Sequence, residues 1–415
     1  MFGWEFPPHI SGGLGTACHG LTQAMMSQGM EVLFVVPKAY GDEPNHNSEI
    51  ISADSIAINK MSSTFKDYHD RFQRIEIESE LKPYISPEEF ERKKKEPFIN
   101  LSTTSARFNF SGAYTNHLFR EIDQYALVAY EIAKKENFDI IHAHDWLTYK
   151  AGVAAKEVSG KPLVVHVHAT EFDRSGSNIN GYVYDIEKEG MERADKVVTV
   201  SNYTAGIVHD HYQIPKDKIE IIHNGASLSD VLRSKIEVPK EKQVIFLGRI
   251  TEQKGPSYFI EAAKKIIDID DTIKFVMAGS GDMMNEMIQK VKYLGIEDNF
   301  HFTGFLKGKE VKEMYAKSKL FVMPSVSEPF GIAPLEAIKQ GVPVIISKQS
   351  GVSEVIRHAV KVDYWDVDAL ADAIYGLVNY PEVSHLMTEN ADQEVNEITW
   401  ERASDKLGVL YHALV

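Results

Sequence analysis

The feature that most constrains the fold of this chain is a regular alternation between short apolar segments and longer helical stretches. Apolar, β-rich runs recur through the first part of the sequence, at residues 31–36, 138–144, 162–168, 196–201 and 219–225. Strands that alternate with helices are typical of βα units, whose parallel strands form a sheet covered by helices on both faces. The pattern therefore predicts an α/β protein with mostly parallel sheets.

A second series of the same kind follows a polar stretch at residues 227–243. Its apolar runs lie at residues 244–249, 273–282, 300–305, 320–325 and 342–347. Two series of βα units predict two sheets, in two domains that face each other across a cleft. Ligands of such sheets bind outside the carboxyl ends of the strands, and the motifs described below lie at those ends.

We place the domain boundary near residues 225–242. The predicted domains are an N-terminal Rossmann-like domain over residues 1–228 and a C-terminal Rossmann-like domain over residues 240–396. Residues 397–415 form a predicted last helix that packs across the domain junction. Its apolar side chains have the spacing of one helix face: Trp400, Ala403, Leu407 and Leu410.

Composition narrows the class of protein. The 415 residues are 43% hydrophobic and 25% charged, which is enough for two domains with a core each. The net charge of −15 argues against sequence-independent binding to nucleic acid or to an anionic membrane, because both need a basic excess. The single cysteine, Cys18, excludes a disulfide framework. No secretory signal and no apolar run of about 18 residues stand out, so we expect a cytoplasmic protein without an integral membrane segment.

A glycine-rich turn lies near the beginning of the sequence. The segment SGGLG places Gly12, Gly13 and Gly15 at the start of a predicted helix. Glycines there let backbone N–H groups approach an anion, and the helix N-terminus favours negative charge. The third glycine of a dinucleotide fingerprint is missing at position 18. The turn is a candidate phosphate site, and a tight strand-to-helix link is the alternative.

Two cations follow the first strand of the second series. In the segment VIFLGRITEQKGP, Arg249 comes directly after the strand and Lys254 follows before a Gly-Pro break. A guanidinium and an ammonium at a strand end suit a diphosphate, whose developing charge they stabilise when it leaves. Two solvated loop cations are the alternative. The segment AGSGD, which contains Gly281, adds another glycine-rich turn near them.

Four histidines lie on two strands that we expect to be adjacent, in the segments IIHAHDW and VVHVHATEF. They are His142, His144, His166 and His168, and Asp145 follows the first pair. Residues i and i+2 of a strand share a face, so a His-x-His pair beside an aspartate is a possible metal site. Against a metal, both pairs lie inside apolar strands, where histidines serve as core residues or substrate contacts.

Two glutamates flank an apolar turn in the segment SEPFGIAPLEA. Gly331 suits the turn and Pro334 the first turn of a helix, which places Glu336 near the helix N-terminus, where negative charge is favoured. Pro329 forces an extended backbone on Glu328 and is expected to direct its carboxylate out of the loop. The two carboxylates can then accept hydrogen bonds from two sets of hydroxyls, while the N–H groups of residues 330–333 meet phosphate.

These motifs resemble those of the retaining nucleotide-sugar glycosyltransferases with the GT-B fold, the family 4 enzymes of glycosyl transferases group 1, which share their architecture with bacterial glycogen synthases. The resemblance covers nearly the whole chain in the family's order. It is carried by SGGLG, FDIIHAHDW, VVHVHATEFDRSG, ERADKVVTVSNYT, IIHNG, GRITEQKG, AGSGD and EPFGIAPLEA. The most specific part is a glutamate pair separated by seven residues, downstream of Arg-x4-Lys.

The resemblance implies a role for each motif. Glu328 would contact hydroxyls of the transferred sugar, while Arg249 and Lys254 would neutralise the diphosphate. His168 would contact the sugar near the reacting carbon, and the implied catalytic set is these four residues. The implied donor-binding residues are Gly12, Gly13, Asp145, Gly281, Phe330, Gly331, Ile332 and Glu336, the last holding the ribose. Closure of the two domains would complete the site.

The implied chemistry is transfer of a hexose, glucose in the first instance, from a nucleoside-diphosphate sugar to a hydroxyl of a glycan or small-molecule acceptor. The anomeric configuration would be retained through attack on the face from which the phosphate departs. The resemblance implies no metal and no cofactor beyond the nucleotide-sugar co-substrate, which makes the histidines sugar contacts and core residues.

Other functions stay open on the sequence. A metal-dependent hydrolase would use His142, His144, His166 and His168. A non-catalytic protein that binds sugar nucleotides would share the motifs without turnover. Within the same fold, a non-hydrolysing epimerase or a phosphorylase is possible, but the lysine-bound pyridoxal phosphate of a phosphorylase has no signal here.

Overall fold

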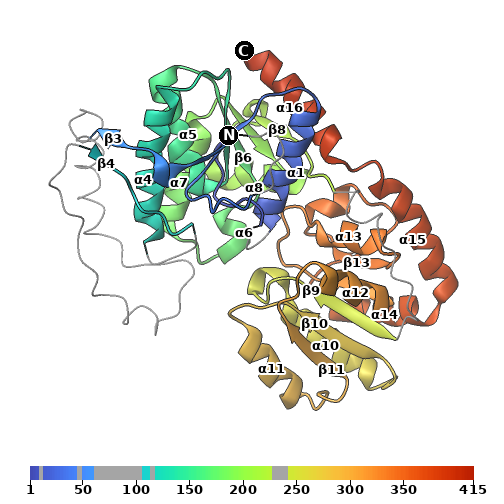
Figure 1. The fold of residues 1–415 in the computed structure, drawn as a ribbon. Helices are drawn as coiled ribbons and strands as arrows, with labels where there is room; N and C mark the ends of the chain where they lie inside the picture. Colours follow the sequence, from blue (N-terminus) through green and yellow to red (C-terminus); the bar gives the residue numbers. More distant parts are fainter. Residues whose placement is uncertain (9–12, 44–48, 60–104, 113–116, 227–241) are drawn as a thin grey trace, which may run out of the picture.

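The computed structural model describes residues 1–8, 13–43, 49–59, 105–112, 117–226 and 242–415. Figure 1 shows two α/β bodies, which we call the first half (residues 1–226, blue to green) and the second half (residues 242–396, yellow to red). Each is built on a parallel sheet with helices around it. The predicted α/β fold is therefore confirmed.

Four parallel strands form the main sheet of the first half. Their order is β5 (Ile141–His144), β6 (Leu163–Val167), β7 (Lys196–Thr199) and β8 (Ile219–Ile221). β5, β6 and most of β7 consist of buried residues, as expected for strands covered on both faces. The neighbouring parallel pair is β1 (Leu33–Val36) and β2 (Glu49–Ser52).

The opening segment joins these two sets of strands. Phe2 forms bridges with Val35 of β1 and Ala143 of β5. Its N–H donates to the carbonyl of His142 at 2.8 Å, and its carbonyl accepts from the N–H of His144 at 3.0 Å. Phe2 thus occupies a strand position between β1 and β5.

Helices cover the first-half sheet. They are α1 (Gly13–Ser27), α4 (Leu118–Ala133), α5 (Trp146–Ser159), α6 (Glu171–Ser175), α7 (Gly181–Arg193) and α8 (Asn202–Tyr212). Short elements complete this half: η1 (Ala53–Ser55), η2 (Lys216–Lys218) and the antiparallel pair β3 (Ile58–Asn59) and β4 (Ser105–Ala106). The core includes fully buried Tyr125, Val165 and Val197, from a helix and two strands.

The second half contains a six-stranded parallel sheet. Its order is β11 (Phe300–Gly304), β10 (Lys274–Ala278), β9 (Gln243–Leu247), β12 (Leu320–Met323), β13 (Val344–Ser347) and β14 (Val360–Val362). This is the doubly wound order, in which the chain reverses direction across the sheet between β9 and β12. The carboxyl ends of those two strands are therefore the expected ligand site.

Helices also surround the second-half sheet. They are α10 (Pro256–Ile267), α11 (Met284–Tyr293), α12 (Lys309–Lys317), α13 (Ala333–Lys339), α14 (Val367–Asn379) and α15 (Pro381–Val395). The single-turn helices η3 (Glu252–Lys254) and η4 (Gly351–Glu354) follow β9 and β13. Fully buried Phe259, Phe275 and Leu320 pack between helix and sheet in the core.

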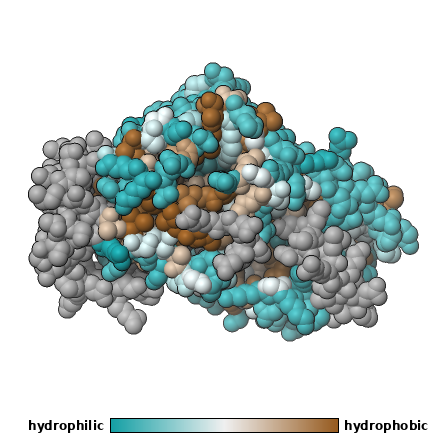
Figure 2. All heavy atoms as spheres, turned by 45° about the horizontal axis from the view of Figure 1, so that its top comes forward, coloured by the Kyte–Doolittle hydropathy of each residue, from teal (hydrophilic) through white to brown (hydrophobic). Residues whose placement is uncertain are grey.

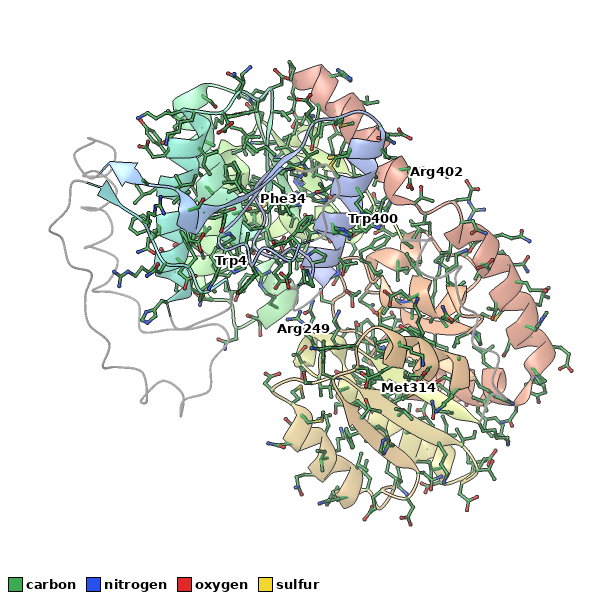
Figure 3. All side chains as sticks on the ribbon, viewed as in Figure 1. Trp4, Phe34, Arg249, Met314, Trp400 and Arg402 are labelled. Atoms are coloured by element: carbon green, nitrogen blue, oxygen red, sulfur yellow. The ribbon has the colours of Figure 1, made fainter. Side chains whose placement is uncertain are left out.

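The last helix, α16 (Trp400–Leu414), leaves the second half and lies beside α1 of the first half (Figures 1 and 3). Trp400 fills the space over Gly20, where an added Cβ would lie 2.4 Å from the indole nitrogen. Gln28 donates to the carboxylate of Asp405 at 2.8 Å. The predicted domain limits stay predictions, since residues 227–241 are outside the described residues.

Much of the surface is hydrophilic. Figure 2 shows a face that is largely hydrophilic, with hydrophobic side chains gathered near its middle. Of the helices in the described part of the chain, none has the combined length and apolar character needed to cross a bilayer.

Candidate active site

The predicted cations and the acidic loop meet at the carboxyl ends of β9 and β12. Arg249 and Lys254 follow β9, and Glu328 follows β12, its neighbour in the sheet. Gly281 follows β10 on the other side of β9. The reversal point of the sheet therefore brings together residues that are far apart in the sequence, as the fold requires.

Lys254 and Glu328 form an ion pair between the ammonium nitrogen and Oε2. The side chains are 19% and 9% exposed, and the hydroxyl of Ser325 donates to the same oxygen at 3.3 Å. A carboxylate this buried needs a counter-charge or donors, because removal from water penalises the charged form. We expected the carboxylate to point out of the loop, and that prediction is wrong, since Glu328 turns inward to Lys254.

The backbone of Glu328 is extended, as the following proline predicts. Its N–H donates to the carbonyl of Gln349 at 3.0 Å, and its carbonyl accepts from Gly351 at 2.9 Å. These bonds make a parallel bridge to Ser350. The loop is thereby fixed to the segment after β13 in the same half.

Arg249 lies on the side of the second half that faces the first half (Figure 3). It is exposed, and its guanidinium donates to Oε1 of buried Gln253 at 3.1 Å. The carbonyl of Gln253 in turn accepts from Val326 at 2.9 Å. Gln253 thus links Arg249 to the loop that carries Glu328, and leaves guanidinium donors directed at solvent.

The turn after Glu328 depends on its glycine. Gly331 has φ of +99°, and an added Cβ would lie 3.1 Å from Cγ of Glu328. Phe330 is buried in the core, and its carbonyl accepts from Val352 at 2.6 Å. Among the described residues, the N–H groups of Phe330, Gly331 and Ile332 donate to no backbone carbonyl. These donors are where a phosphate was predicted.

Glu336 lies in the first turn of α13, as predicted, and no side-chain cap precedes it. The carboxyl is half-buried, and burial raises its pKa above the ordinary value, with partial compensation from a hydrogen bond of Tyr315. The Tyr315 hydroxyl also lies 3.2 Å from the carbonyl of Ala333. The hydrogen bond with Tyr315 of α12 thus holds Glu336 on the face of α13 that is directed toward α12.

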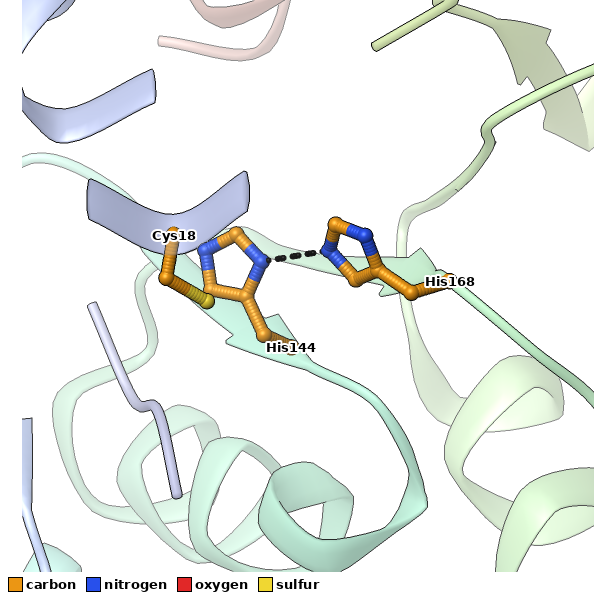
Figure 4. Close-up of side chains that lie close together, drawn as sticks. All are labelled: Cys18, His144 and His168. Atoms are coloured by element: carbon orange, nitrogen blue, oxygen red, sulfur yellow. Dashed lines mark hydrogen bonds between the residues drawn. The ribbon is translucent and has the colours of Figure 1, made fainter. Parts of the chain in front are cut away.

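The four histidines form one cluster, because β5 pairs with β6 in a register that places His144 opposite His166. His142, His144 and His166 are buried, and His168 is half-buried. His144 Nδ1 lies 3.0 Å from His168 Nε2 (Figure 4). His142 Nε2 lies 3.2 Å from His166 Nδ1, and its Nδ1 contacts the hydroxyl of Tyr411 from α16. The rings within each strand stack at centroid distances of 4.4 and 4.2 Å.

Burial keeps these histidines neutral. It lowers the pKa of His168 to about 3, and it lowers the pKa values of His142, His144 and His166 well below the ordinary value. A neutral imidazole can donate from one nitrogen and accept at the other. The cluster therefore satisfies part of its hydrogen bonding internally, as core histidines do.

Two groups in this cluster have the composition of a metal site. They are Cys18 with His144 and His168, and His142 with His144 and His166; the donor atoms of each lie within 4.8 Å of one another. Figure 4 shows Cys18 of α1 beside the His144 ring. Among the histidines of this cluster, the buried nitrogens without a partner in the described structure are His144 Nε2, His166 Nε2 and His168 Nδ1. Burial raises the pKa of Cys18 well above its ordinary value, which disfavours the thiolate that a metal needs.

Asp145, which the sequence suggested as a metal ligand or donor contact, bonds to backbone N–H groups of its own half. Its carboxylate accepts from the backbone N–H groups of His168 at 2.7 Å and Ala169 at 3.3 Å. Burial raises its pKa to about 6, and the positive charge of Arg174 offsets part of that effect. Asp145 thus fixes the backbone after β6, next to His168.

The glycines of the predicted phosphate turns are only partly described. Gly12 lies outside the described residues, and Gly13 begins α1 with open space where a Cβ would be. Gly281 is needed by the protein itself, since a Cβ there would lie 2.1 Å from the carbonyl of Ile250. Their roles with phosphate remain predictions.

Closure of the two domains was predicted, but the individual bonds between them were not. The hydroxyl of Ser327 donates to Asp173 of α6, and Glu354 of η4 accepts from the N–H groups of Asn202 and Tyr203 at the start of α8. Asp173 also closes a capping box with Thr170. That Thr-x-x-Asp pattern was visible in the sequence, but its partner in the other half was not.

Comparisons with known proteins agree on one family. Residues 230–394 match Glycosyl transferases group 1, and residues 87–230 match Glycosyltransferase Family 4. An uncharacterized glycosyltransferase of Methanocaldococcus jannaschii is 30% identical over 375 residues, which cover 87% of this chain and 83% of that protein. A glycogen synthase of Mycobacterium tuberculosis is 22% identical over 431 residues, which cover 100% of this chain and 94% of that protein.

Solved structures share the fold. Sucrose-phosphate synthase from Thermosynechococcus elongatus matches with a TM-score of 0.71 at 19% identity, covering 97% of this chain and 94% of that chain. The Anabaena protein HepE in complex with UDP-glucose matches with a TM-score of 0.59 at 21% identity, covering 70% of this chain and 82% of that chain.

Proposed function

The chain belongs to the glycosyl transferases of group 1 and family 4 and has the GT-B fold, and we propose that it moves a hexose from a nucleoside diphosphate to a hydroxyl of a glycan or small-molecule acceptor. We propose glucose as the hexose and retention of the anomeric configuration. We further propose that the reaction needs no metal and no resident cofactor. A cytoplasmic location stays a prediction from the sequence.

The observation that carries this proposal is the convergence of opposite charges at the reversal point of the second-half sheet. Lys254 and Glu328 are 74 residues apart in sequence and form an ion pair there. Arg249 stands beside them, exposed and linked to the same loop through Gln253. One carboxylate suits sugar hydroxyls and two cations suit a diphosphate, which together match the two ends of a nucleotide sugar.

In the proposed reaction, the bond between the anomeric carbon and the phosphate oxygen breaks while the acceptor oxygen bonds to the same face of that carbon. The departing phosphate oxygen takes the proton of the acceptor hydroxyl. Arg249 and Lys254 stabilise the negative charge that develops on the diphosphate. Glu328, released in part from Lys254 when the phosphate arrives, accepts hydrogen bonds from the sugar hydroxyls.

His168 would act on the sugar as a neutral group. Burial lowers its pKa to about 3, so it contributes a hydrogen bond and no positive charge. Its Nδ1 has no partner among the described residues, and the Nε2 is held by His144. A sugar hydroxyl near the reacting carbon would give that nitrogen a partner.

The donor base is proposed from similarity alone. The fold matches HepE in complex with UDP-glucose, so UDP-glucose is the first donor to test. The assay offers UDP-, ADP- and GDP-hexoses with malto-oligosaccharide and monosaccharide acceptors, and it measures release of the nucleoside diphosphate. We expect turnover with one of these donors, and no turnover or binding with any of them would contradict the proposal.

A metal-dependent hydrolase is the second candidate, and the two groups of possible metal ligands around His144 favour it. Metal analysis of the purified protein separates the candidates. A stoichiometric transition metal, with activity lost to a chelator and restored by the metal, would support the hydrolase and contradict the metal-independent transferase.

A further inference from the structure

The residues on both sides of Glu328 are bonded to the first half of the chain. The hydroxyl of Ser327 donates to Oδ1 of Asp173 at 2.5 Å. The carbonyl of Pro329 accepts from the hydroxyl of Ser201 at 2.6 Å. Glu328 itself pairs with Lys254 inside the second half. The two halves therefore hold one short loop from opposite sides.

Asp173 is a fixed anchor for this contact. Its Oδ2 accepts from the N–H of Thr170 at 2.7 Å and from the Thr170 hydroxyl at 2.8 Å, within the capping box of α6. The side chain is 2% exposed. Since Oδ2 is committed to Thr170, Oδ1 is the oxygen that remains for the other half, and the buried carboxylate has little freedom to move.

The Ser327 hydroxyl has its partners in the first half. Besides donating to Asp173, its oxygen lies 3.0 Å from the hydroxyl of Tyr203. Ser327 is buried, at 9% exposure. When the halves separate, this hydroxyl loses both partners, and the loop with Glu328 keeps only the bonds of its own half.

We propose that Asp173 is a positioning residue, which acts through Ser327 to set the place of Glu328 when the two halves meet. The proposal rests on the proposed function, because it takes Glu328 as the contact to the transferred sugar. Closure of the halves then completes the sugar site as well as covering it. The nucleotide part has its proposed cations and ribose contact, Arg249, Lys254 and Glu336, in the second half and should depend little on this contact.

A second group of contacts between the halves differs in kind. Glu354 accepts from Asn202 and Tyr203 at the start of α8 and from His223 at 2.9 Å. Glu354 lies on η4, 26 residues after Glu328 in the sequence. Its carboxylate lies at the N-terminus of α8, where negative charge is favoured. Glu354 holds the halves together through its own carboxylate, whereas the same turn is bonded to the Glu328 loop by backbone groups, from Gly351 to the carbonyl of Glu328 and from Val352 to that of Phe330.

The test compares the affinities of UDP and UDP-glucose, measured by calorimetry on the full chain. For Ser327→Ala, we expect UDP to bind as in the wild type and UDP-glucose to bind about tenfold more weakly, as for one lost hydrogen bond to a charged group. Ser327→Thr keeps the hydroxyl and should recover the affinity. Ser353→Ala is the matched control, because that hydroxyl bonds only Lys348 and Ser350 of its own half.

The ratio of the UDP and UDP-glucose affinities shows whether Asp173 positions Glu328 through Ser327. Equal weakening of UDP and UDP-glucose in Ser327→Ala, or an unchanged ratio of the two affinities, would overturn the positioning role, and a lower melting temperature alone would leave that ratio unchanged. A double-mutant cycle with Asp173→Asn should show that the two substitutions are not additive, and additive effects would overturn the link. If the wild type binds neither ligand, the proposed function itself fails.

Discussion

The two halves of this molecule bury polar groups by different means. In the first half, the four neutral histidines lie on β5, on β6 and directly after β6, and they bond to one another and to Tyr411. In the second half, Lys254 and Glu328 form a partly buried ion pair. Neutral groups in a core are stable without a ligand, whereas a partly buried pair can exchange partners when a charged ligand arrives. We therefore propose that the second half binds the charged diphosphate of the donor.

The largest expected effect comes from removing the cation of the pair. Lys254→Ala leaves Glu328 buried without its counter-charge and removes stabilisation of the leaving diphosphate. We expect transfer to fall by roughly 100-fold or more, about 3 kcal/mol of transition-state stabilisation, and a similar loss for Arg249→Ala. Rates are measured at a temperature where circular dichroism shows the variant to be folded.

Lys264→Ala is the matched control for the lysine variant. Lys264 pairs with Asp268 four residues on, and both side chains are partly exposed. Such a surface pair contributes little, so the rate should stay near that of the wild type. If Lys254→Ala transfers sugar at a rate within twofold of the wild type, Lys254 does not stabilise the leaving diphosphate.

The next prediction concerns acid sensitivity, which the comparison assigns to the first half. The folded state lowers the pKa of His166 well below 6.5, so the unfolded chain binds more protons below that pH. Stability is therefore lost as pH falls below 6.5, by up to about 1.4 kcal/mol per pH unit for each such histidine. His166→Gln should flatten this loss, measured by urea unfolding between pH 7 and pH 4.

Two buried acids act in the opposite direction. The folded state raises the pKa of Asp145 to about 6 and that of Glu187 to about 7, and their stabilising effect is lost as pH rises through those values. Both acids are unchanged in His166→Gln, so the difference between variant and wild type isolates the histidine. His385→Gln, at a side chain 74% exposed, should follow the wild-type profile, and an equal profile for both variants would refute the assignment.

A smaller effect is expected at the contact between α16 and the histidines. Tyr411→Phe removes the hydroxyl that contacts His142 and should lower the free energy of unfolding by about 1 kcal/mol. Tyr293→Phe, at a ring 89% exposed, is the matched control and should change nothing. A Tyr411→Phe variant as stable as the control would mean that the hydroxyl bond adds nothing to the docking of α16.

The smallest expected effect is that of a chelator. If the histidines are neutral core residues, the purified protein should contain no stoichiometric metal, and prolonged treatment with EDTA should change neither the melting temperature nor the transfer rate. A drop in both that added zinc restores would make His144 and its neighbours metal ligands.

The sequence predicted the fold well where the signal was local. Alternating apolar runs identified the strands β5, β6, β9 and β12, because each is a continuous buried segment. It did not predict β14, whose three residues lack a long apolar run. The order of the parallel strands in each sheet depends on tertiary contacts, which the spacing of apolar residues along the sequence does not reveal.

The sequence predicted which residues form the candidate site, but not how their side chains contact one another. Arg249, Lys254 and Glu328 were named, but their sequence positions do not reveal that Lys254 turns to Glu328. The rule for a residue before proline described the backbone of Glu328 correctly and its side chain wrongly. Asp173 carried a local signal as a helix cap, while its contact with Ser327 joins residues 154 apart.

Proton NMR of the product formed from UDP-α-glucose, followed in time with EDTA present, tests most directly whether the chain is a retaining hexosyltransferase. We expect a new glycosidic bond in the α configuration, formed together with one UDP per linkage. A β-linked product, or sugar release only when a metal is supplied, would contradict it.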